Sequence, residues 1–209
     1  MDELSLRQHQ SISKDHFDAL YDRDIDPWAY QTSAFEAKKR ASTIEALAGR
    51  TFTRALEFGC SIGVLTVDLS AHCETLVGVD GSQAACKSAR DRLSDHPHVK
   101  IVQAHFPKDI AKLHTLGQFD LIVLSEVLYF FSNDDLHMLA DYVCDALLPN
   151  GLCSVVNFDG ETEAGFSGAE ARQIFAQLTS QRLIRTHFQT FDGYEIATFV
   201  QSSALSALS

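Results

Sequence analysis

The stretch from Thr53 to Asp80 constrains the fold of this chain more than any other. Its sequence, TRALEFGCSIGVLTVDLSAHCETLVGVD, contains two apolar runs of strand length with a glycine-bearing turn and a helical pattern between them. The predicted elements are a strand over 54–58, a turn over 59–63, a helix over 64–71 and a strand over 75–79. Together with the terminal acid Asp80, this order is typical of the first half of a nucleotide-binding α/β sheet.

The turn and the acid predict what such a unit binds. Gly59 and Gly63 allow the backbone to bend sharply and to approach a ligand closely. The helix that follows presents unpaired N–H groups to that ligand. Asp80, at the end of the second strand, is placed to accept hydrogen bonds from both hydroxyls of a ribose. The unit therefore predicts a nucleoside-containing ligand.

Two residues of the turn narrow the ligand further. The register is Glu57-x-Gly59-x-Ser61-x-Gly63, with an acid entering the turn and a serine where a middle glycine could stand. A carboxylate here repels the pyrophosphate of a dinucleotide but suits a ligand with an ammonium or sulfonium charge. The pattern favours S-adenosylmethionine (SAM) and disfavours a nicotinamide oxidoreductase. The cofactor-binding residues predicted from this stretch are Glu57, Gly59, Cys60, Ser61, Gly63, Asp80 and Gly81.

The rest of the chain continues the alternation of strands and helices. Further helices are predicted over 82–93, 133–148 and 168–179, and further strands over 98–104, 118–126, 152–158, 183–189 and 194–201. Pro149-Asn150-Gly151 is expected to form a turn before the fifth strand. The last two strands flank Asp192-Gly193 and predict an antiparallel hairpin at the edge of a mostly parallel sheet.

Residues 1–50 differ from this pattern and predict a separate helical segment. Lys14 to Asp22 has apolar residues at one-turn spacing, and Asp26-Pro27 ends that helix. Ser33 is a good N-cap for a second, amphipathic helix that Gly49 closes. We therefore expect an N-terminal helical cap over residues 1–50 and a cofactor-binding core over residues 51–209.

The acid-x-Gly-x-Gly-x-Gly pattern resembles the first motif of class I SAM-dependent methyltransferases. That resemblance implies a Rossmann-like seven-stranded sheet of order 3-2-1-4-5-7-6, with the last strand antiparallel and helices on both faces. In such enzymes an acid near the end of the third strand often binds the adenine amino group. Here Ala104, His105 and Phe106 occupy that place. His105 could accept this hydrogen bond, or the backbone at Ala104 could do so while Phe106 packs on the ring; an exposed loop histidine is the alternative.

The end of the fourth strand carries the residues predicted to face the methyl acceptor. Ser125, Glu126 and Tyr129 lie at the carboxyl edge, where open α/β sheets bind ligands. In the resembling family this region flanks the methionine part of SAM. Glu126 is the candidate for holding or deprotonating an amine, and it could equally cap the next segment. Glu126 and Tyr129 are therefore the predicted catalytic residues, and Ser125 and Glu126 are also predicted to bind the cofactor.

The N-terminal segment carries a narrower resemblance, to the rhizobial nodulation-factor N-methyltransferases (the NodS family). Its motifs are Asp26-Pro27-Trp28, Phe35-Glu36-x-Lys38-Lys39-Arg40, Ala55 to Cys60, Ser125 to Tyr129 and Gly165 to Glu170. The resemblance implies that N-terminal helices cap the SAM pocket, with Trp28 near the cofactor and a basic residue on its carboxylate. Lys39 occupies that basic position where the family has arginine. Packing for Trp28 and a solvated face for the basic run are the alternatives.

Composition and charge exclude several classes of function. The 209 residues carry 17 Lys and Arg against 28 Asp and Glu, a net charge of −11. A nucleic-acid substrate is disfavoured because proteins that bind phosphates usually show the opposite balance. The five cysteines and nine histidines fit no disulfide framework or metal site, and no leader or membrane span is visible. We expect a cytoplasmic monomer or homodimer with free thiols, no metal, and neither a membrane nor a nucleic acid as partner.

The sequence thus predicts a methyltransferase that uses SAM, releases S-adenosylhomocysteine and acts on a small molecule. The NodS resemblance implies an amine acceptor, such as an amino sugar or a chitooligosaccharide-type amine. Methylation of an oxygen on a small metabolite, or a catalytically silent SAM-binding protein, are the alternatives.

Overall fold

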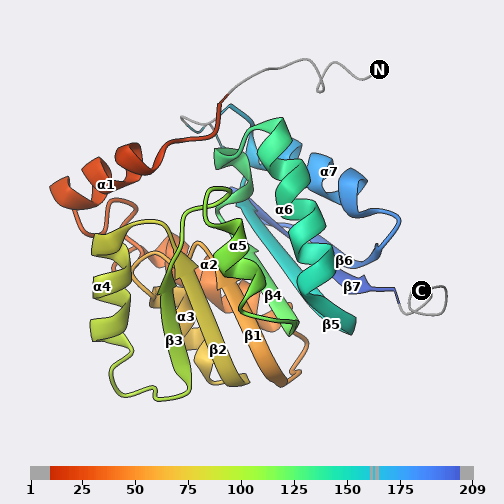
Figure 1. Ribbon diagram of the computed structural model, residues 1–209, viewed down its shortest axis with the longest axis horizontal. Coiled ribbons are helices and arrows are strands. Elements are labelled where there is room, and N and C mark those ends of the chain that lie inside the picture. Colours follow the sequence, from red (N-terminus) through yellow and green to blue (C-terminus); the bar gives the residue numbers. More distant parts are fainter. Residues whose placement is uncertain (1–9, 161, 163–164, 203–209) are drawn as a thin grey trace. The chain divides into compact units, whose positions relative to one another are not determined.

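The computed structural model describes residues 10–160, 162 and 165–202 of the chain (Figure 1). Its seven strands have the order β3-β2-β1-β4-β5-β7-β6, so the predicted sheet is confirmed. The strands are β1 (Phe52–Phe58), β2 (Cys73–Asp80), β3 (Val99–Gln103), β4 (Phe119–Ser125), β5 (Leu147–Phe158), β6 (Leu183–Thr190) and β7 (Tyr194–Gln201). The chain divides into two compact units, one of residues 13–116 and one of residues 117–202 with 10–12.

The first unit consists of three parallel strands and the helices that cover them. β1 pairs with β2 and β2 with β3, both in parallel register. The helices are α1 (Lys14–Arg23), α2 (Ala34–Glu45), α3 (Val64–Ser70), α4 (Gln83–Arg92) and α5 (Ile110–His114). α3 packs on β2, α4 packs on β2 and β3, and α1 lies against α4 (Figure 1). A buried cluster that includes Cys60, Cys86 and Ile101 joins the loop after β1 to α4 and β3.

Serine N-caps begin several of the helices, as their sequences indicate. The Ser33 hydroxyl accepts the N–H of Glu36 at the start of α2, and the Ser82 hydroxyl accepts the N–H of Ala85 at the start of α4. The predicted boundaries of both helices are close to the observed ones, although α2 ends at Glu45, four residues before Gly49. The helix α5 was not predicted from the sequence.

The second unit carries the C-terminal half of the sheet. β4 and β5 are parallel, whereas β7 is antiparallel to both β5 and β6, as expected for the hairpin. The short 3-10 helix η2 (Leu128–Phe130) follows β4, and the helices α6 (Asn133–Ala146) and α7 (Gly168–Thr179) pack together (Figure 1). Ser167 and Glu170 form a capping box at the start of α7.

The prediction of a turn at Pro149-Asn150-Gly151 was wrong. β5 already begins at Leu147, and these residues lie within the strand. The pairing with β4 moves from Phe119–Leu147 to Leu121–Leu152, so the extra residues form an irregularity of the strand. Asn150 has a φ of 62°, in the left-handed region that asparagine tolerates better than most residues, so a residue typical of turns occurs inside the strand.

One expectation about organisation, the division into a cap and a core, remains a prediction. The expected cap over residues 1–50 and core over residues 51–209 are functional regions, which the compact units do not test. The unit of residues 13–116 contains both α1–α2 of the expected cap and β1–β3 of the expected core. Residues 1–9 of the expected cap lie outside the described residues. In the part of the chain that the structure describes, no helix has both the length and the apolar character needed to span a bilayer.

Gly63 offers a test of how closely α3 and α4 approach each other. Its φ is 81°, and a Cβ there would lie 3.1 Å from the Cα and Cβ of Ala89. Gly63→Ala should therefore lower the free energy of unfolding by more than the ~1–2 kcal/mol of left-handed strain alone. Gly49→Ala is the matched control, because Gly49 has a φ of 69° and open space around it. Urea unfolding followed by circular dichroism measures both; equal losses would contradict close packing at Gly63.

Candidate functional site

The loop between β1 and α3 is fixed by the end of β2. The N–H groups of Gly59 and Cys60 both donate to the Val79 carbonyl, at 2.7 and 2.9 Å. The next N–H, that of Ser61, donates to Asp80 Oδ2 at 2.9 Å. Three successive amide groups are thus used within the protein, so the loop has its shape before any ligand binds.

Left-handed backbone conformations recur at every second residue of this loop. Gly59, Ser61 and Gly63 have φ angles of 77°, 49° and 81°. Glycine adopts such angles without strain, whereas serine does so only when its surroundings hold it there. Gly59 and Gly63 therefore stand where the backbone adopts left-handed angles, as the sequence predicted. Ser61 adopts such an angle without being glycine, and this requires an explanation.

Asp80 ties the loop to the start of α4. Its Oδ2 accepts the Ser61 N–H, and its Oδ1 accepts the Ser82 N–H at 2.8 Å. Burial raises the pKa of Asp80, and the N–H groups of Ser82 and Ser61 act in the opposite direction. A carboxylate oxygen can accept two hydrogen bonds, so each oxygen of Asp80 can still accept one from a ligand.

Glu57 is a buried acid at the end of β1. Its side chain is 2% exposed, and its Oε2 has no hydrogen-bond partner among the described residues. Burial raises the pKa of Glu57 to about 8, the nearby Asp80 adds to the shift, and the Thr66 hydroxyl opposes it. Such a carboxyl group is expected to favour a cationic ligand, because a positive charge would stabilise its ionised form.

The ends of β2 and β3 meet at the residues predicted to bind adenine. The Ala104 N–H donates to the Asp80 carbonyl at 2.9 Å, and a Cβ on Gly81 would lie 3.2 Å from the His105 ring. Phe106 is buried against Phe58, with their ring centroids 5.6 Å apart. Gly81, predicted to bind the cofactor, is thus brought together in the first unit with the three residues predicted to bind adenine, Ala104, His105 and Phe106; these roles stay predictions.

The N-terminal segment packs against the same loop. Asp26 accepts the N–H groups of Tyr30 and Gln31 and so forms the turn that carries Trp28. The centroid of the Trp28 ring lies 5.8 Å from the centroid of the Tyr21 ring and 5.6 Å from that of Tyr30. Tyr21 packs on Ile62 of the loop and donates or accepts a hydrogen bond with the Ser61 hydroxyl at 2.6 Å.

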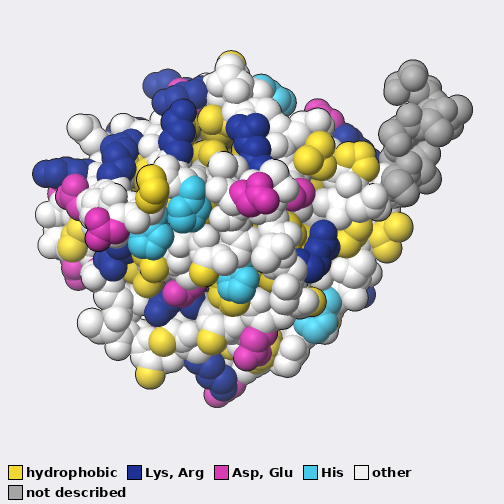
Figure 2. Space-filling view, turned by 90° about the horizontal axis from the view of Figure 1, so that it is seen from below, with side chains coloured by type: hydrophobic (Ala, Val, Ile, Leu, Met, Phe, Trp, Pro, Cys, Tyr) yellow, Lys and Arg dark blue, Asp and Glu magenta, His cyan; other side chains and the backbone are white. Residues whose placement is uncertain are grey.

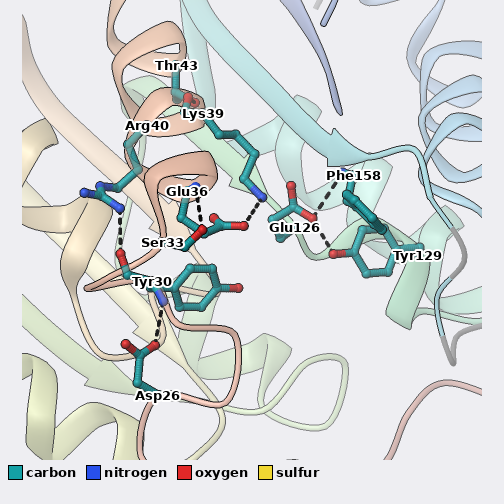
Figure 3. A network of polar contacts seen from close by, with 10 residues as sticks. All are labelled: Asp26, Tyr30, Ser33, Glu36, Lys39, Arg40, Thr43, Glu126, Tyr129 and Phe158. Atoms are coloured by element: carbon teal, nitrogen blue, oxygen red, sulfur yellow. Dashed lines mark hydrogen bonds and ion pairs between the residues drawn. The ribbon is translucent and has the colours of Figure 1, made fainter. Parts of the chain in front are cut away.

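Two basic residues of α2, Lys39 and Arg40, have partners within the first unit (Figure 3). Lys39 is 5% exposed and forms an ion pair of 2.9 Å with Glu36. Arg40 donates to the Tyr30 carbonyl at 2.7 Å and pairs with Asp68 at 3.0 Å. Arg40 therefore joins the turn of Trp28 to α3, and the predicted role of Lys39 in holding a carboxylate remains untested.

In the second unit, Glu126 follows β4 directly, after Ser125 (Figure 3). Its Oε2 accepts hydrogen bonds from the Tyr129 hydroxyl and from the Phe158 N–H at the end of β5. Glu126 is 8% exposed and has a φ of 59°, an unusual backbone conformation for glutamate. The sequence predicted only that Glu126 and Tyr129 both follow the fourth strand; it did not predict the hydrogen bond between them.

Sequence reasoning missed three groups. Tyr21 was predicted only as part of a helix, although the serine at position 61 was a signal that the loop needs a partner. Arg92 was not considered, yet it donates to the Ile62 carbonyl at 2.8 Å and to Gln31 at 2.7 Å. The Phe158 N–H that holds Glu126 is a backbone group and has no sequence signal.

The surface charges, the possible metal ligands and the cysteines complete the description of the polar groups. Acidic, basic and histidine side chains are interspersed on the face seen in Figure 2. Among the residues that the structure describes, no three His, Cys, Asp or Glu side chains are grouped so that they could hold a metal ion. Cys60, Cys86, Cys144 and Cys153 are buried free thiols.

A family model described as Nodulation protein S (NodS) matches residues 13–152, two thirds of the chain. The chain belongs to the NodS family. Nodulation protein S of Bradyrhizobium diazoefficiens is 35% identical over 123 residues, which cover 57% of this chain and 57% of that protein. Its counterpart in Sinorhizobium fredii is 32% identical over 109 residues, 52% of this chain and 49% of that protein. The chain spans about half the length of these curated relatives.

Solved structures agree with the NodS assignment at the level of the fold. The N-methyltransferase NodS from Bradyrhizobium japonicum, in complex with S-adenosylhomocysteine, has a TM-score of 0.74 and 22% identity; the match covers 88% of this chain and 97% of that one. A putative methyltransferase from Pseudomonas syringae has a TM-score of 0.68 and 31% identity, with 81% and 100% covered. The fold of this NodS-family chain is thus that of class I methyltransferases.

The raised pKa of Glu57 predicts how stability depends on pH. Between the ordinary pKa of 4.5 and the folded value of about 8, the folded protein holds a proton that the unfolded chain releases. The contribution of Glu57 to the free energy of unfolding should therefore fall as the pH rises through this range. Glu57→Gln, which carries no charge, should gain stability relative to the original protein as the pH rises from 5 to 8. Urea unfolding of both proteins across that range measures the difference, and parallel curves would contradict it.

Proposed function

We propose that this NodS-family chain is a SAM-dependent methyltransferase that transfers a methyl group to a small-molecule amine and releases S-adenosylhomocysteine. One observation carries the proposal: the amide groups of Gly59, Cys60 and Ser61 are already taken by Val79 and Asp80. A pyrophosphate would need such amides, and it would meet the carboxyl groups of Glu57 and Asp80 as well. The loop suits a nucleoside ligand with a positive charge.

The residues present fit SAM. Asp80 offers a carboxylate at the end of β2 for the two ribose hydroxyls. Glu57 offers a buried carboxyl oxygen without a partner in the described chain, next to a loop whose backbone allows close approach. An ammonium or sulfonium charge would compensate the ionised form of Glu57. Trp28 and Tyr21 supply aromatic surface from the N-terminal segment, which supports the predicted cap.

SAM, when bound, supplies a methyl group that its sulfonium already activates, so the protein has to align the acceptor and exclude water. An amine must lose its proton before it can attack. We assign that task to Glu126, whose carboxylate is oriented by the Tyr129 hydroxyl and the Phe158 N–H. With SAM bound, the N–C bond would form as the S–C bond broke, which would leave S-adenosylhomocysteine and the methylated amine as products and the proton of the amine on Glu126.

Only the similarity to NodS relatives narrows the chemical class of the methyl acceptor. The Bradyrhizobium japonicum relative is described as an N-methyltransferase, and the curated relatives as nodulation proteins. These descriptions favour an amino sugar or a chitooligosaccharide-type amine for this chain as well. The predictions of a cytoplasmic location and of a monomer or homodimer are part of the same proposal.

Turnover with labelled SAM tests the function. Purified protein is incubated with amino sugars, chitooligosaccharides with a free amine, simple amines and hydroxylated metabolites. Methylated product from the amines supports the proposal, whereas product from hydroxylated metabolites alone would identify an O-methyltransferase. Binding of SAM without turnover of any acceptor would indicate a silent SAM-binding protein.

Asp80→Ala should weaken SAM binding at least tenfold, because each hydrogen bond to a charged acceptor contributes ~1.5–3 kcal/mol. Calorimetric titration measures the dissociation constant, and circular dichroism verifies the fold. Glu74→Ala is the control, since Glu74 is an exposed acid near the start of β2, at the opposite end of that strand from Asp80. Unchanged affinity in Asp80→Ala would remove Asp80 from the cofactor site.

Glu126→Gln should lower kcat for an amine acceptor by about 10²–10⁴-fold, the usual range for loss of a general base. The affinity for S-adenosylhomocysteine should stay within about twofold of the original, because the change removes only a charge that serves the acceptor. Tyr129→Phe leaves the carboxylate in place and should have a smaller effect on kcat. Steady-state kinetics with an amine found in the turnover assay measures kcat for both variants, and inhibition by S-adenosylhomocysteine in the same assay measures its affinity. Equal kcat values for Glu126→Gln and the original protein would exclude Glu126 as the base.

A further inference from the structure

Ser61 is the one non-glycine among the three left-handed residues of the loop. Its φ is 49°, and the glycines two positions before and after it, Gly59 and Gly63, have φ angles of 77° and 81°. Glycine would adopt this conformation without strain, so a serine must gain something from its hydroxyl. Its N–H already donates to Asp80, which leaves the side chain as the group that distinguishes it from glycine.

The Ser61 hydroxyl has a specific partner from outside the loop. It lies 2.6 Å from the Tyr21 hydroxyl, on a helix forty residues earlier in the chain. Tyr21 is 5% exposed, so the loss of this partner would leave a buried hydroxyl to be satisfied elsewhere. Ser61 is therefore held from two directions, by the Asp80 carboxylate and by Tyr21.

The attachment of α1 depends on the same tyrosine. Tyr21 is the single buried residue of this ten-residue helix, which is too short to be stable alone. It packs in one cluster with Ile62 and Ala85, against which Phe17 and Trp28 also lie. Arg92 adds a second connection, because it donates to the Ile62 carbonyl and to Gln31. The N-terminal segment thus contacts two consecutive residues of the loop.

We propose that Tyr21 is a positioning residue for the cofactor: its hydroxyl holds Ser61 in the left-handed conformation and so couples the docking of α1 to SAM binding. The inference rests on the proposed function, since it assumes that the loop binds SAM. Coupling is reciprocal, so a ligand that requires the ordered loop should also hold α1 in place.

Cofactor binding by a set of variants tests this role. Tyr21→Phe removes the hydroxyl and keeps the ring, and it should weaken binding of S-adenosylhomocysteine about threefold to tenfold, as expected for one hydrogen bond. Ser61→Gly in the Tyr21→Phe background should restore binding to within about twofold of the original, because glycine holds the left-handed conformation without a partner. Ser61→Ala in that background keeps the strain and should restore nothing. Tyr142→Phe, which alters a buried tyrosine on α6, is the control and should bind as the original does.

A second readout follows α1 directly. Hydrogen exchange of residues 14–23 in the ligand-free protein should be faster in Tyr21→Phe, and S-adenosylhomocysteine should slow it less than in the original protein. Under steady-state turnover, the KM for SAM should rise in Tyr21→Phe while kcat changes little.

The outcomes separate the two proposals. Original protein that fails to bind S-adenosylhomocysteine or SAM would overturn the proposed function and this inference with it. If the original protein binds and Tyr21→Phe binds equally well, only this inference is overturned. Weakened binding that Ser61→Gly does not rescue would also overturn it, because the Tyr21 hydroxyl would then act by a route other than the conformation of Ser61.

Discussion

The two hydrogen bonds of Asp80 are the constraint on which the rest of the candidate cofactor site depends. One oxygen holds Ser61 in the loop after β1, and the other holds Ser82 at the start of α4. A buried carboxylate is unfavourable unless such donors satisfy it, so the conformations of the loop and of the helix start are set together. The same residue is the one proposed to bind ribose, so in that proposal one side chain both shapes the loop and contacts the ligand.

The fold could be predicted from the sequence because most elements carry local signals. Apolar runs mark the strands, and serines such as Ser33, Ser82 and Ser167 cap the helices that follow them. The prediction failed where local and tertiary signals disagree. Asn150 has the backbone of a turn residue, but pairing with β4 keeps it inside β5. The short helix α5, five residues long, has too little periodicity to be recognised.

The candidate site was predictable only where its residues belong to one contiguous motif. Glu57, Gly59, Gly63 and Asp80 follow from the spacing of a single β-α-β unit. The contact of Tyr21 with Ser61 joins residues forty positions apart, and no periodicity reports it. Glu126 depends on a backbone N–H of Phe158, a donor that every residue except proline possesses. Contacts of this kind are created by the fold and appear only in three dimensions.

The boundary of the family match divides the proposed chemistry into two parts. The matched residues, 13–152, include the loop, Asp80, Tyr21 and Glu126, which are the groups assigned to the cofactor and to proton removal. Phe158, α7 and the hairpin of β6 and β7 lie beyond the match. The proposed cofactor contacts therefore all lie within the matched range, whereas the Glu126 carboxylate is oriented in part by the Phe158 N–H, from outside that range.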